Sequence, residues 1–207
     1  MRTAAVFGIE ACPVQVEVDV SFGLPCFNMV GLPDASVRES RDRVRSAIRN
    51  SGFEFPMERI TVNLAPADIR KAGSSFDLPI AIGVLAAAGL IARREVDDVL
   101  LLGELSLDGG IHPARGVLPI AAAARRQRVS ALLLPRPNRA EAAVVEGLRL
   151  YAVRSLAEAV DALNDPSAFV ARETIDPVPA VPPARTGGDF ADVHGQALAR
   201  RALEIAA

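Results

Sequence analysis

The sequence predicts a fold of the α/β (α+β) class, and three observations lead to that class. Strand-like segments dominate residues 1–30, whereas strand-like and helical segments alternate after residue 99. Such alternation is typical of a parallel or mixed sheet with helices packed on it. Between these two parts, residues 76–91 are apolar almost all round, which predicts a helix buried in a core.

The N-terminal part begins with three predicted strands. Residues 14–20 alternate apolar and polar side chains with a period of two, which is typical of a half-buried antiparallel strand. Asp34 then begins a helix over residues 35–50, and Gly52 ends it. The predicted strands of this part cover residues 3–9, 14–20, 26–30 and 60–64.

The second part starts with a polar loop over residues 68–75 and the apolar helix over 76–91. Pro79 falls in the first turn of that helix, where a missing N–H costs little. A tight turn at Gly109 and Gly110 separates short strands. The predicted strands cover residues 99–102, 104–107, 131–134 and 148–153, and the predicted helices cover residues 117–127, 139–146 and 156–163.

The alternation ends near residue 165. Five prolines between residues 166 and 183, followed by Gly187 and Gly188, predict a partly extended linker. Order returns after it, with a helix expected from Gly195 onward. We therefore expect a domain over residues 1–165, a linker over 166–188 and the start of a further domain over 189–207.

The chain has 23 basic and 25 acidic residues, and its formal net charge is −2. This balance argues against a protein coated in phosphate-binding charge, although a local patch remains compatible with it. The longest apolar stretch, residues 78–92, is shorter than the roughly 20 residues of a membrane-spanning helix. Met1 leads straight into a predicted strand, with no leader pattern. We expect a soluble cytoplasmic protein without membrane contact.

Cysteine and histidine are too sparse for a structural zinc site. Cys12, Cys26, His112 and His194 are spread over the chain without paired spacing, so no metal ligands are predicted. A disulfide between the two cysteines is conceivable, but a pair of buried free thiols fits a reducing cytoplasm better. Lys71 is the only lysine, so any function that needs a lysine must use it.

The loop over residues 70–77 is the first candidate site. Its Gly-Ser sequence leads into the N-terminus of the buried helix, where free N–H groups could bind an anion or stabilise an oxyanion. It is not a P-loop, because Lys71 precedes Gly73 and no Gly-x-x-x-x-Gly-Lys occurs in the chain. The alternative is that Ser74 or Ser75 only caps the helix.

Three longer motifs carry a family resemblance. The segments are Gly-Leu-Pro-Cys-Phe-Asn-Met-Val-Gly-Leu-Pro-Asp at residues 23–34, Ile-Thr-Val-Asn-Leu-Ala-Pro-Ala-Asp at 60–68 and Lys-Ala-Gly-Ser-Ser-Phe-Asp-Leu-Pro at 71–79. They resemble the N-terminal region of the bacterial magnesium-chelatase-like AAA+ ATPases, the ComM/YifB family. Residues 189–196 are similar to the segment that leads into the ATPase module of that family.

The resemblance implies a Lon-protease-like domain, of the ribosomal protein S5 domain 2 type, placed before a hexameric ATPase. The Walker motifs of that ATPase would follow residue 207, so the chain as given should not hydrolyse ATP. ATP and magnesium are expected for the longer parent protein, and no cofactor is expected in this chain. The family is associated with branch-migrating helicases that process DNA during natural transformation.

A Lon-like fold raises the question of peptidase activity. Lon proteases use a serine–lysine dyad, and the resemblance places Ser75 near the position of the nucleophile. The lysine should then fall near residue 118, which is Leu118, and Lys71 lies on the wrong side of the loop. A variant with His112 as the base is the remaining possibility. We therefore expect no catalytic residues, with Gly73, Ser74 and Ser75 as a vestigial active-site loop.

The second candidate site is a row of arginines on the helix over residues 35–50. Arg38, Arg41, Arg45 and Arg49 are three or four residues apart and share one flank, where they could follow a phosphate backbone. The row could also be a solvated face tied down by Asp42, or a protomer interface in the ring. No aromatic residues are interleaved with it for base stacking.

Taken together, the residues predict a non-catalytic element of a AAA+ motor that contacts DNA or organises the ring. A Ser75-dependent peptidase and a pure oligomerisation or regulatory module are the alternatives. The candidate DNA contacts are Arg38, Arg41, Arg45, Arg49, Arg70 and Lys71.

Overall fold

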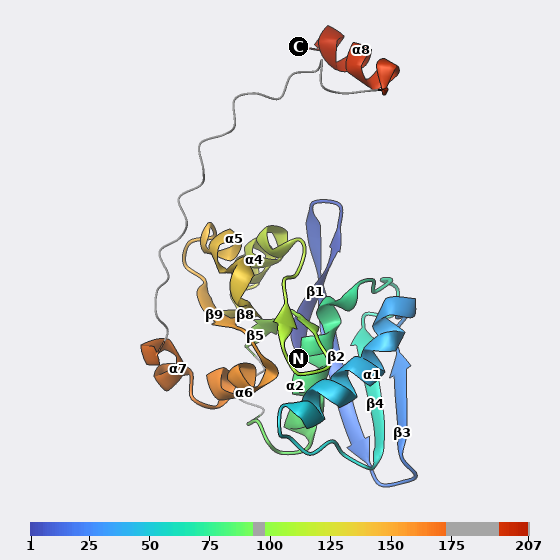
Figure 1. Ribbon diagram of the computed structural model, residues 1–207, viewed down its shortest axis with the longest axis vertical. Coiled ribbons are helices and arrows are strands. Elements are labelled where there is room, and N and C mark those ends of the chain that lie inside the picture. Colours follow the sequence, from blue (N-terminus) through green and yellow to red (C-terminus); the bar gives the residue numbers. More distant parts are fainter. Residues whose placement is uncertain (93–97, 173–194, 207) are drawn as a thin grey trace. The chain divides into compact units, whose positions relative to one another are not determined.

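A seven-stranded sheet with the strand order β3-β4-β2-β1-β5-β8-β9 organises the first part of the chain (Figure 1). The computed structural model describes residues 1–92, 98–172 and 195–206. Among the described strand pairs of this sheet, four are parallel and two are antiparallel. The predicted α/β class is confirmed. The strands are β1 (Arg2–Phe7), β2 (Glu10–Ser21), β3 (Cys26–Val30), β4 (Arg59–Ala65), β5 (Val99–Leu101), β8 (Ala131–Pro135) and β9 (Arg149–Val153).

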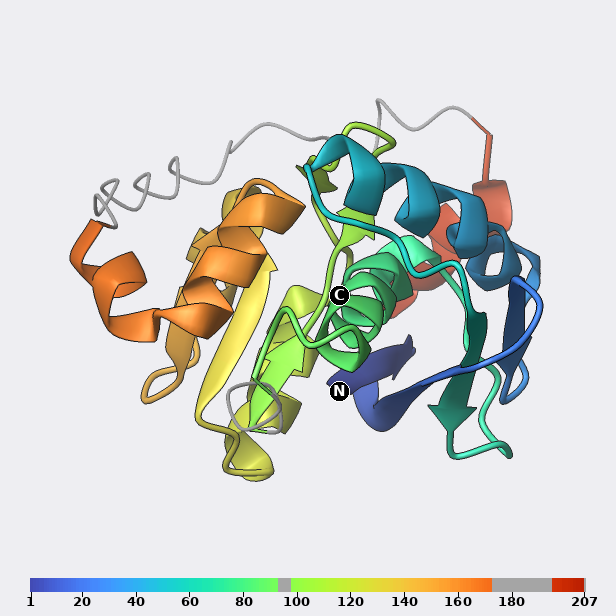
Figure 2. The ribbon, with the colours of Figure 1, turned by 90° about the horizontal axis from the view of Figure 1, so that it is seen from below.

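Helices cover both faces of this sheet. Helices α1, α2 and α6 pack into one hydrophobic core, and α4 and α5 pack into a second core on the opposite face (Figure 2). A small hairpin of β6 (Glu104–Leu105) and β7 (Ile111–His112) adjoins them. The helices are α1 (Ala35–Asn50), α2 (Asp77–Ala87), α4 (Val117–Arg126), α5 (Arg139–Ala143), α6 (Leu156–Asn164) and α7 (Pro166–Arg172).

The chain divides into two units, Met1–Thr174 and Ile175–Ala207. In the second unit the described element is helix α8 (Ala197–Ala206), which agrees with the helix expected after Gly195. Within the described ranges, no helix is both long enough and apolar enough to cross a membrane.

The predicted strands of the N-terminal part are present. β2 pairs antiparallel with both β1 and β4, as its alternating sequence predicts, and its apolar side chains at Val14 and Val16 are buried. β3 is the edge strand of the sheet and runs parallel to β4. That parallel pairing needs a crossover, and α1 is the element that connects the two strands.

Three helical segments differ from the expected bounds. The predicted helix over 139–146 ends at Ala143, and the apolar helix over 76–91 ends at Ala87. Residues 166–172, expected as the start of the linker, form α7 because Asp165 accepts a hydrogen bond from the N–H of Ala168 (2.9 Å). Pro166 fits the first helical position, since no N–H is needed there. The rest of the predicted linker, up to 188, lies outside the described residues.

Both ends of α1 are attached to other parts of the fold. Asp34 caps the N-terminus, where its Oδ1 accepts a hydrogen bond from the N–H of Val37 (2.9 Å). At the C-terminal end, the amide of Asn50 donates to the carbonyl of Leu107 (2.7 Å). A capping carboxylate stabilises a helix by about 1 kcal/mol, so the N-terminal end of α1 is firmly defined.

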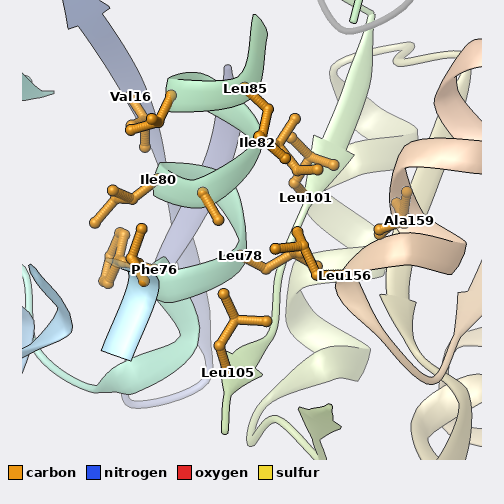
Figure 3. Packing of buried hydrophobic residues seen from close by; sticks show 14 of the residues in the cluster. Val16, Phe76, Leu78, Ile80, Ile82, Leu85, Leu101, Leu105, Leu156 and Ala159 are labelled. Atoms are coloured by element: carbon orange, nitrogen blue, oxygen red, sulfur yellow. The ribbon is translucent and has the colours of Figure 1, made fainter. Parts of the chain in front are cut away.

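Helix α2 is buried on nearly every side, as its apolar sequence predicts. Leu78, Ile82 and Leu85 contact the core on the side of Leu101 and α6, whereas Ile80 lies on the side of Val16 (Figure 3). Because no face is left to solvent, α2 is the centre on which α1, β2 and α6 assemble. The loop that precedes it, residues 71–76, is thereby held against the core.

The two cysteines are free thiols, as expected, but their predicted burial is wrong. Cys12 is partly buried and Cys26 is exposed on edge strand β3. An edge strand with an uncovered side leaves this thiol in contact with solvent.

Candidate functional site

Residues 72–75 line a cleft of about 450 Å³ between β1, β6 and the N-terminal end of α4; we call it the serine cleft. Ser74 donates a hydrogen bond to the carboxylate of Glu104. The carbonyl of Ser75 accepts from the N–H of Gly103 (3.1 Å), which fixes the loop against the strand. The polar or charged side chains of its lining are Ser74, Ser75, Glu104 and Arg115.

Ser74 and Ser75 are not caps of α2, so that interpretation of the loop is wrong. Both belong to a short 3-10 turn, Ser74–Phe76, and α2 begins after it without a side-chain cap. The hydroxyl of Ser74 is occupied by Glu104 instead. The predicted vestigial loop of Gly73, Ser74 and Ser75 thus lies in a cleft with room for a ligand, and its role stays a prediction.

The residues that line the serine cleft supply no base for Ser75. Neither a lysine nor a histidine occurs among them, and His112 is exposed outside this lining. The position expected for a dyad lysine holds Leu118, which is partly exposed. A serine without a base is a weak nucleophile at neutral pH. The arrangement therefore favours a non-catalytic cleft.

Lys71 is fully buried, and its predicted role as a DNA contact is wrong. Its Nζ donates to the carbonyl of Pro66, while its backbone pairs with the segment before α1. There the N–H of Asp34 donates to the carbonyl of Lys71 (2.9 Å), and the N–H of Lys71 donates to Leu32 (3.2 Å). Burial lowers the pKa of Lys71, and the nearby carboxylate of Asp68 opposes that shift. Lys71 is a junction between two loops.

An ion pair that the sequence analysis did not identify joins α1 to α2. Asp77 is fully buried, and Arg43 donates to both its oxygens, at 2.7 Å from Nε and 3.0 Å from Nη2. Asp77 also accepts from the N–H of Leu105 (3.3 Å), while Arg43 reaches the carbonyl of Ser36 (3.1 Å). Burial raises the pKa of Asp77, whereas Arg43 opposes that shift; the hydrogen bond to Asp77 raises the pKa of Arg43.

The signal for this pair was present in the sequence. An aspartate in the first turn of an otherwise apolar helix needs a partner if it is buried. Arg43 borders the buried stripe of α1 that contains Val44 and Ala47, on the flank opposite the arginine row. The separation of 34 residues between Arg43 and Asp77 made the pairing invisible to local spacing.

The arginine row is largely exposed to solvent. Arg38, Arg41 and Arg49 are exposed, and Arg70 lies close enough to the N-terminus of α1 for its charge to act on Asp34. We call these four residues with Arg45 the arginine face. Burial raises the pKa of Asp34, but hydrogen bonds from Val37 and Ser36, with the charge of Arg70, lower it further than burial raises it.

The predicted tie from Asp42 to Arg38 and Arg45 is not formed. Asp42 is paired with its neighbour Arg41, at 3.4 Å between exposed groups. An exposed pair of this kind contributes little to stability. In the part of the chain that the structure describes, no ion pair involves Arg38, Arg45 or Arg49.

Arg45 differs from the rest of the row because it is half-buried against an aromatic ring. Its guanidinium carbon lies 5.9 Å from the centroid of Phe55, a cation–π contact. Phe27 of β3 stacks with Phe55, with ring centroids 6.5 Å apart. These residues line a second cleft of about 360 Å³, which we call the aromatic cleft; it is lined by Pro25, Cys26, Phe27, Asn28, Arg41, Arg45, Phe55, Pro56, Met57, Glu58 and Ile60.

The aromatic cleft modifies one sequence-based conclusion. No aromatic residue lies within the arginine row itself, as stated above, but the fold brings Phe27 and Phe55 to its side. Phe27 comes from the edge strand and Phe55 from the segment that follows α1. The described residues contain no cluster of three or more histidine, cysteine or acidic side chains that could hold a metal ion.

Comparison with known proteins identifies the class to which this fold belongs. Residues 16–138 match the family described as subunit ChlI of Mg-chelatase. The match covers more than half of the chain, and the chain belongs to this family. It includes α1, the buried helix α2 and the loop with both serines. The predicted family is therefore confirmed.

Individual relatives extend this result. The chain is 40% identical over its whole length to the uncharacterized protein YifB of Escherichia coli, and 39% identical over 98% of its length to the competence protein ComM of Haemophilus influenzae. It spans about 40% of the length of each. A Lon protease of Chloroflexus aurantiacus is 29% identical over 60% of this chain, which covers 16% of that protease. The Lon similarity agrees with the predicted fold.

Proposed function

We propose that this chain is a non-catalytic N-terminal part of a bacterial AAA+ ATPase that processes DNA, and that its arginine face contacts the DNA. The observation that carries the proposal is the exposed row on α1, in which Arg38 and Arg49 form no ion pair with described residues. Guanidinium groups without acidic partners are available to phosphate oxygens. The relative named competence protein ComM supports a role in the uptake or processing of DNA.

ATP, magnesium and a hexameric ring belong to the same proposal, but to the longer parent protein. This chain contains no Gly-x-x-x-x-Gly-Lys sequence to hold a nucleotide phosphate, so we assign no step of ATP hydrolysis to its residues. The absence of a base beside Ser75 in the serine cleft supports a binding role over a peptidase. In this proposal the domain is located in the cytoplasm, where the DNA and the motor meet.

Fluorescence anisotropy with single-stranded, duplex and forked DNA at two salt concentrations tests the contact. The variant Arg38→Glu/Arg41→Glu/Arg49→Glu reverses three charges of the arginine face and leaves Arg45 against Phe55. We expect weaker binding and a shallower dependence of affinity on salt, by about 0.9 in log–log slope for each lost phosphate contact.

A matched control places the same charge change elsewhere. Arg125 and Arg126 at the end of α4 and Arg154 after β9 are also exposed, and α4 covers the face of the sheet opposite α1. Arg125→Glu/Arg126→Glu/Arg154→Glu should bind DNA nearly as the unaltered chain does. Equal losses in both variants would mean that only net charge matters and would contradict the proposed contact. Absence of binding at low salt would favour a module that organises or regulates the ring.

A further inference from the structure

We propose that the aromatic cleft binds an unpaired nucleobase of a DNA strand whose phosphates lie along the arginine face. This inference rests on the proposed function and goes beyond it, because it names the chemical group that is recognised. It concerns a cleft that local sequence spacing could not identify, since its walls come from β3, α1 and the segment after α1.

The cleft has the size and composition of a site for a flat, polar aromatic ring. Its volume of about 360 Å³ lies within the ~300–1,000 Å³ that is typical of small-molecule sites. Phe27 and Phe55 supply stacked aromatic surface on its wall. Bases of single-stranded DNA stack on such rings without sequence preference, because every base has a π-face.

Arg45 provides the donors that a base or its phosphate would need. Its Nε–H is buried and has no hydrogen-bond partner among the described residues, although the guanidinium lies over Phe55. An unsatisfied buried donor is costly, so a ligand acceptor at this place would stabilise the site. Because Arg45 is held by the ring and not by a carboxylate, no ion pair must be broken for a ligand to bind.

Charge favours a nucleotide as the occupant. Arg41 and Arg45 line the cleft, whereas Glu58 is the acidic residue of the lining. The positive charge continues along α1 with Arg38 on one side and Arg49 on the other, so a strand that places one base in the cleft has arginines on both sides of it. An acidic peptide would meet the same arginines but would have no flat ring to stack on Phe27 and Phe55.

Base-bearing and abasic oligonucleotides of equal length separate base recognition from phosphate attraction. Both carry the same phosphate charge, so binding through phosphates alone gives equal affinities. We expect the 207-residue chain to bind oligo(dT) at least about fivefold more tightly than the abasic strand, as loss of one stacked base implies. Equal affinities would overturn the inference and leave the proposed function intact, whereas absence of binding to either strand would overturn both.

Two matched variants locate the effect. Phe55→Leu removes the ring under Arg45, and Phe53→Leu makes the same change at a residue that does not line the cleft. Only Phe55→Leu should abolish the preference for oligo(dT). Should Phe55→Leu fail to fold, photocrosslinking of 5-iododeoxyuridine DNA to the unaltered chain gives the answer by mass spectrometry. Crosslinks at Phe27 or Phe55 support the inference, and crosslinks confined to other peptides overturn it.

Discussion

Arg43 grips the buried carboxylate of Asp77 with two hydrogen bonds of 2.7 and 3.0 Å, and this pair joins the helix that carries the arginine row to the helix at the centre of the core. The third hydrogen bond to Asp77, from the N–H of Leu105, adds β6 and the wall of the serine cleft to the same point. Both candidate sites therefore depend on one buried interaction.

Removal of the arginine should destabilise the fold strongly. Arg43→Met leaves Asp77 buried without its partner, and we expect a loss of about 3 kcal/mol or more in the free energy of unfolding, measured by urea denaturation at pH 7. The double variant Arg43→Met/Asp77→Leu should recover much of that loss, because it replaces the whole pair with apolar groups. A double variant that is less stable than Arg43→Met would contradict this account.

The same pair predicts the sign of a pH effect. The folded-state pKa of Asp77 is raised above its ordinary value of 3.8, so the folded state favours the neutral carboxyl and stability from this group falls as the pH rises through the raised pKa. Arg43→Met removes the charge that limits the rise. Its deficit relative to the unaltered chain should therefore be larger at pH 8 than at pH 4. A deficit independent of pH would show that Asp77 is not its cause.

The burial of Lys71 can be tested by chemical labelling, since it is the only lysine of the chain. In the folded protein, an amine-acylating reagent should leave Lys71 unmodified, and it should react there only after denaturation. Mass spectrometry of the peptide that contains residue 71 measures the difference. Rapid acylation of the native protein would restore Lys71 as a candidate DNA contact. Lys71→Met should bind DNA as tightly as the unaltered chain but be less stable, because the carbonyl of Pro66 loses its donor.

Gly31 should tolerate no side chain. Its φ is +95°, and a Cβ at this position would collide with the backbone carbonyl of Leu64. Gly8 is a matched control, because its φ is +60° and nothing lies within 4 Å of an added Cβ. Gly31→Ala should lose several kcal/mol in thermal or urea unfolding, and Gly8→Ala about 1 kcal/mol. Similar losses in both variants would show that the backbone near Leu64 can move.

Ser75 should not react with an active-site serine probe such as a fluorophosphonate. The serine cleft offers it no lysine or histidine, so the hydroxyl is not activated. The measurement is intact mass after incubation, with Ser75→Ala as the reference. Labelling that disappears in Ser75→Ala would establish a nucleophile and revive the peptidase alternative.

The sequence predicted the features that depend on neighbours along the chain. The alternation in β2, the capping residue Asp34 and the apolar periodicity of α1 depend on such neighbours, and the predicted α1 agrees with the observed bounds. The common flank of the arginines follows from helical geometry alone. These signals need no knowledge of the sheet order.

The features that the sequence analysis missed depend on contacts between distant segments. Lys71 sits in a polar stretch that is typical of an exposed loop, and only its pairing with the segment before α1 buries it. Phe27 and Phe55 meet beside Arg45 because β3 pairs parallel to β4 across α1. No local pattern records that proximity, and the aromatic cleft follows from topology.

Helix α1 is held at three places along its length, by the backbone junction of Asp34 with Lys71, by Arg43 on Asp77 and by Asn50 on Leu107. A helix held in this way cannot bend or slide to adapt to what binds it, so it acts as a ruler of fixed length. At ~1.5 Å per residue, Arg38 and Arg49 lie about 16 Å apart. A B-form strand advances ~3.4 Å per nucleotide, so the proposed footprint is about five nucleotides, beyond which a longer strand gains nothing further from this face.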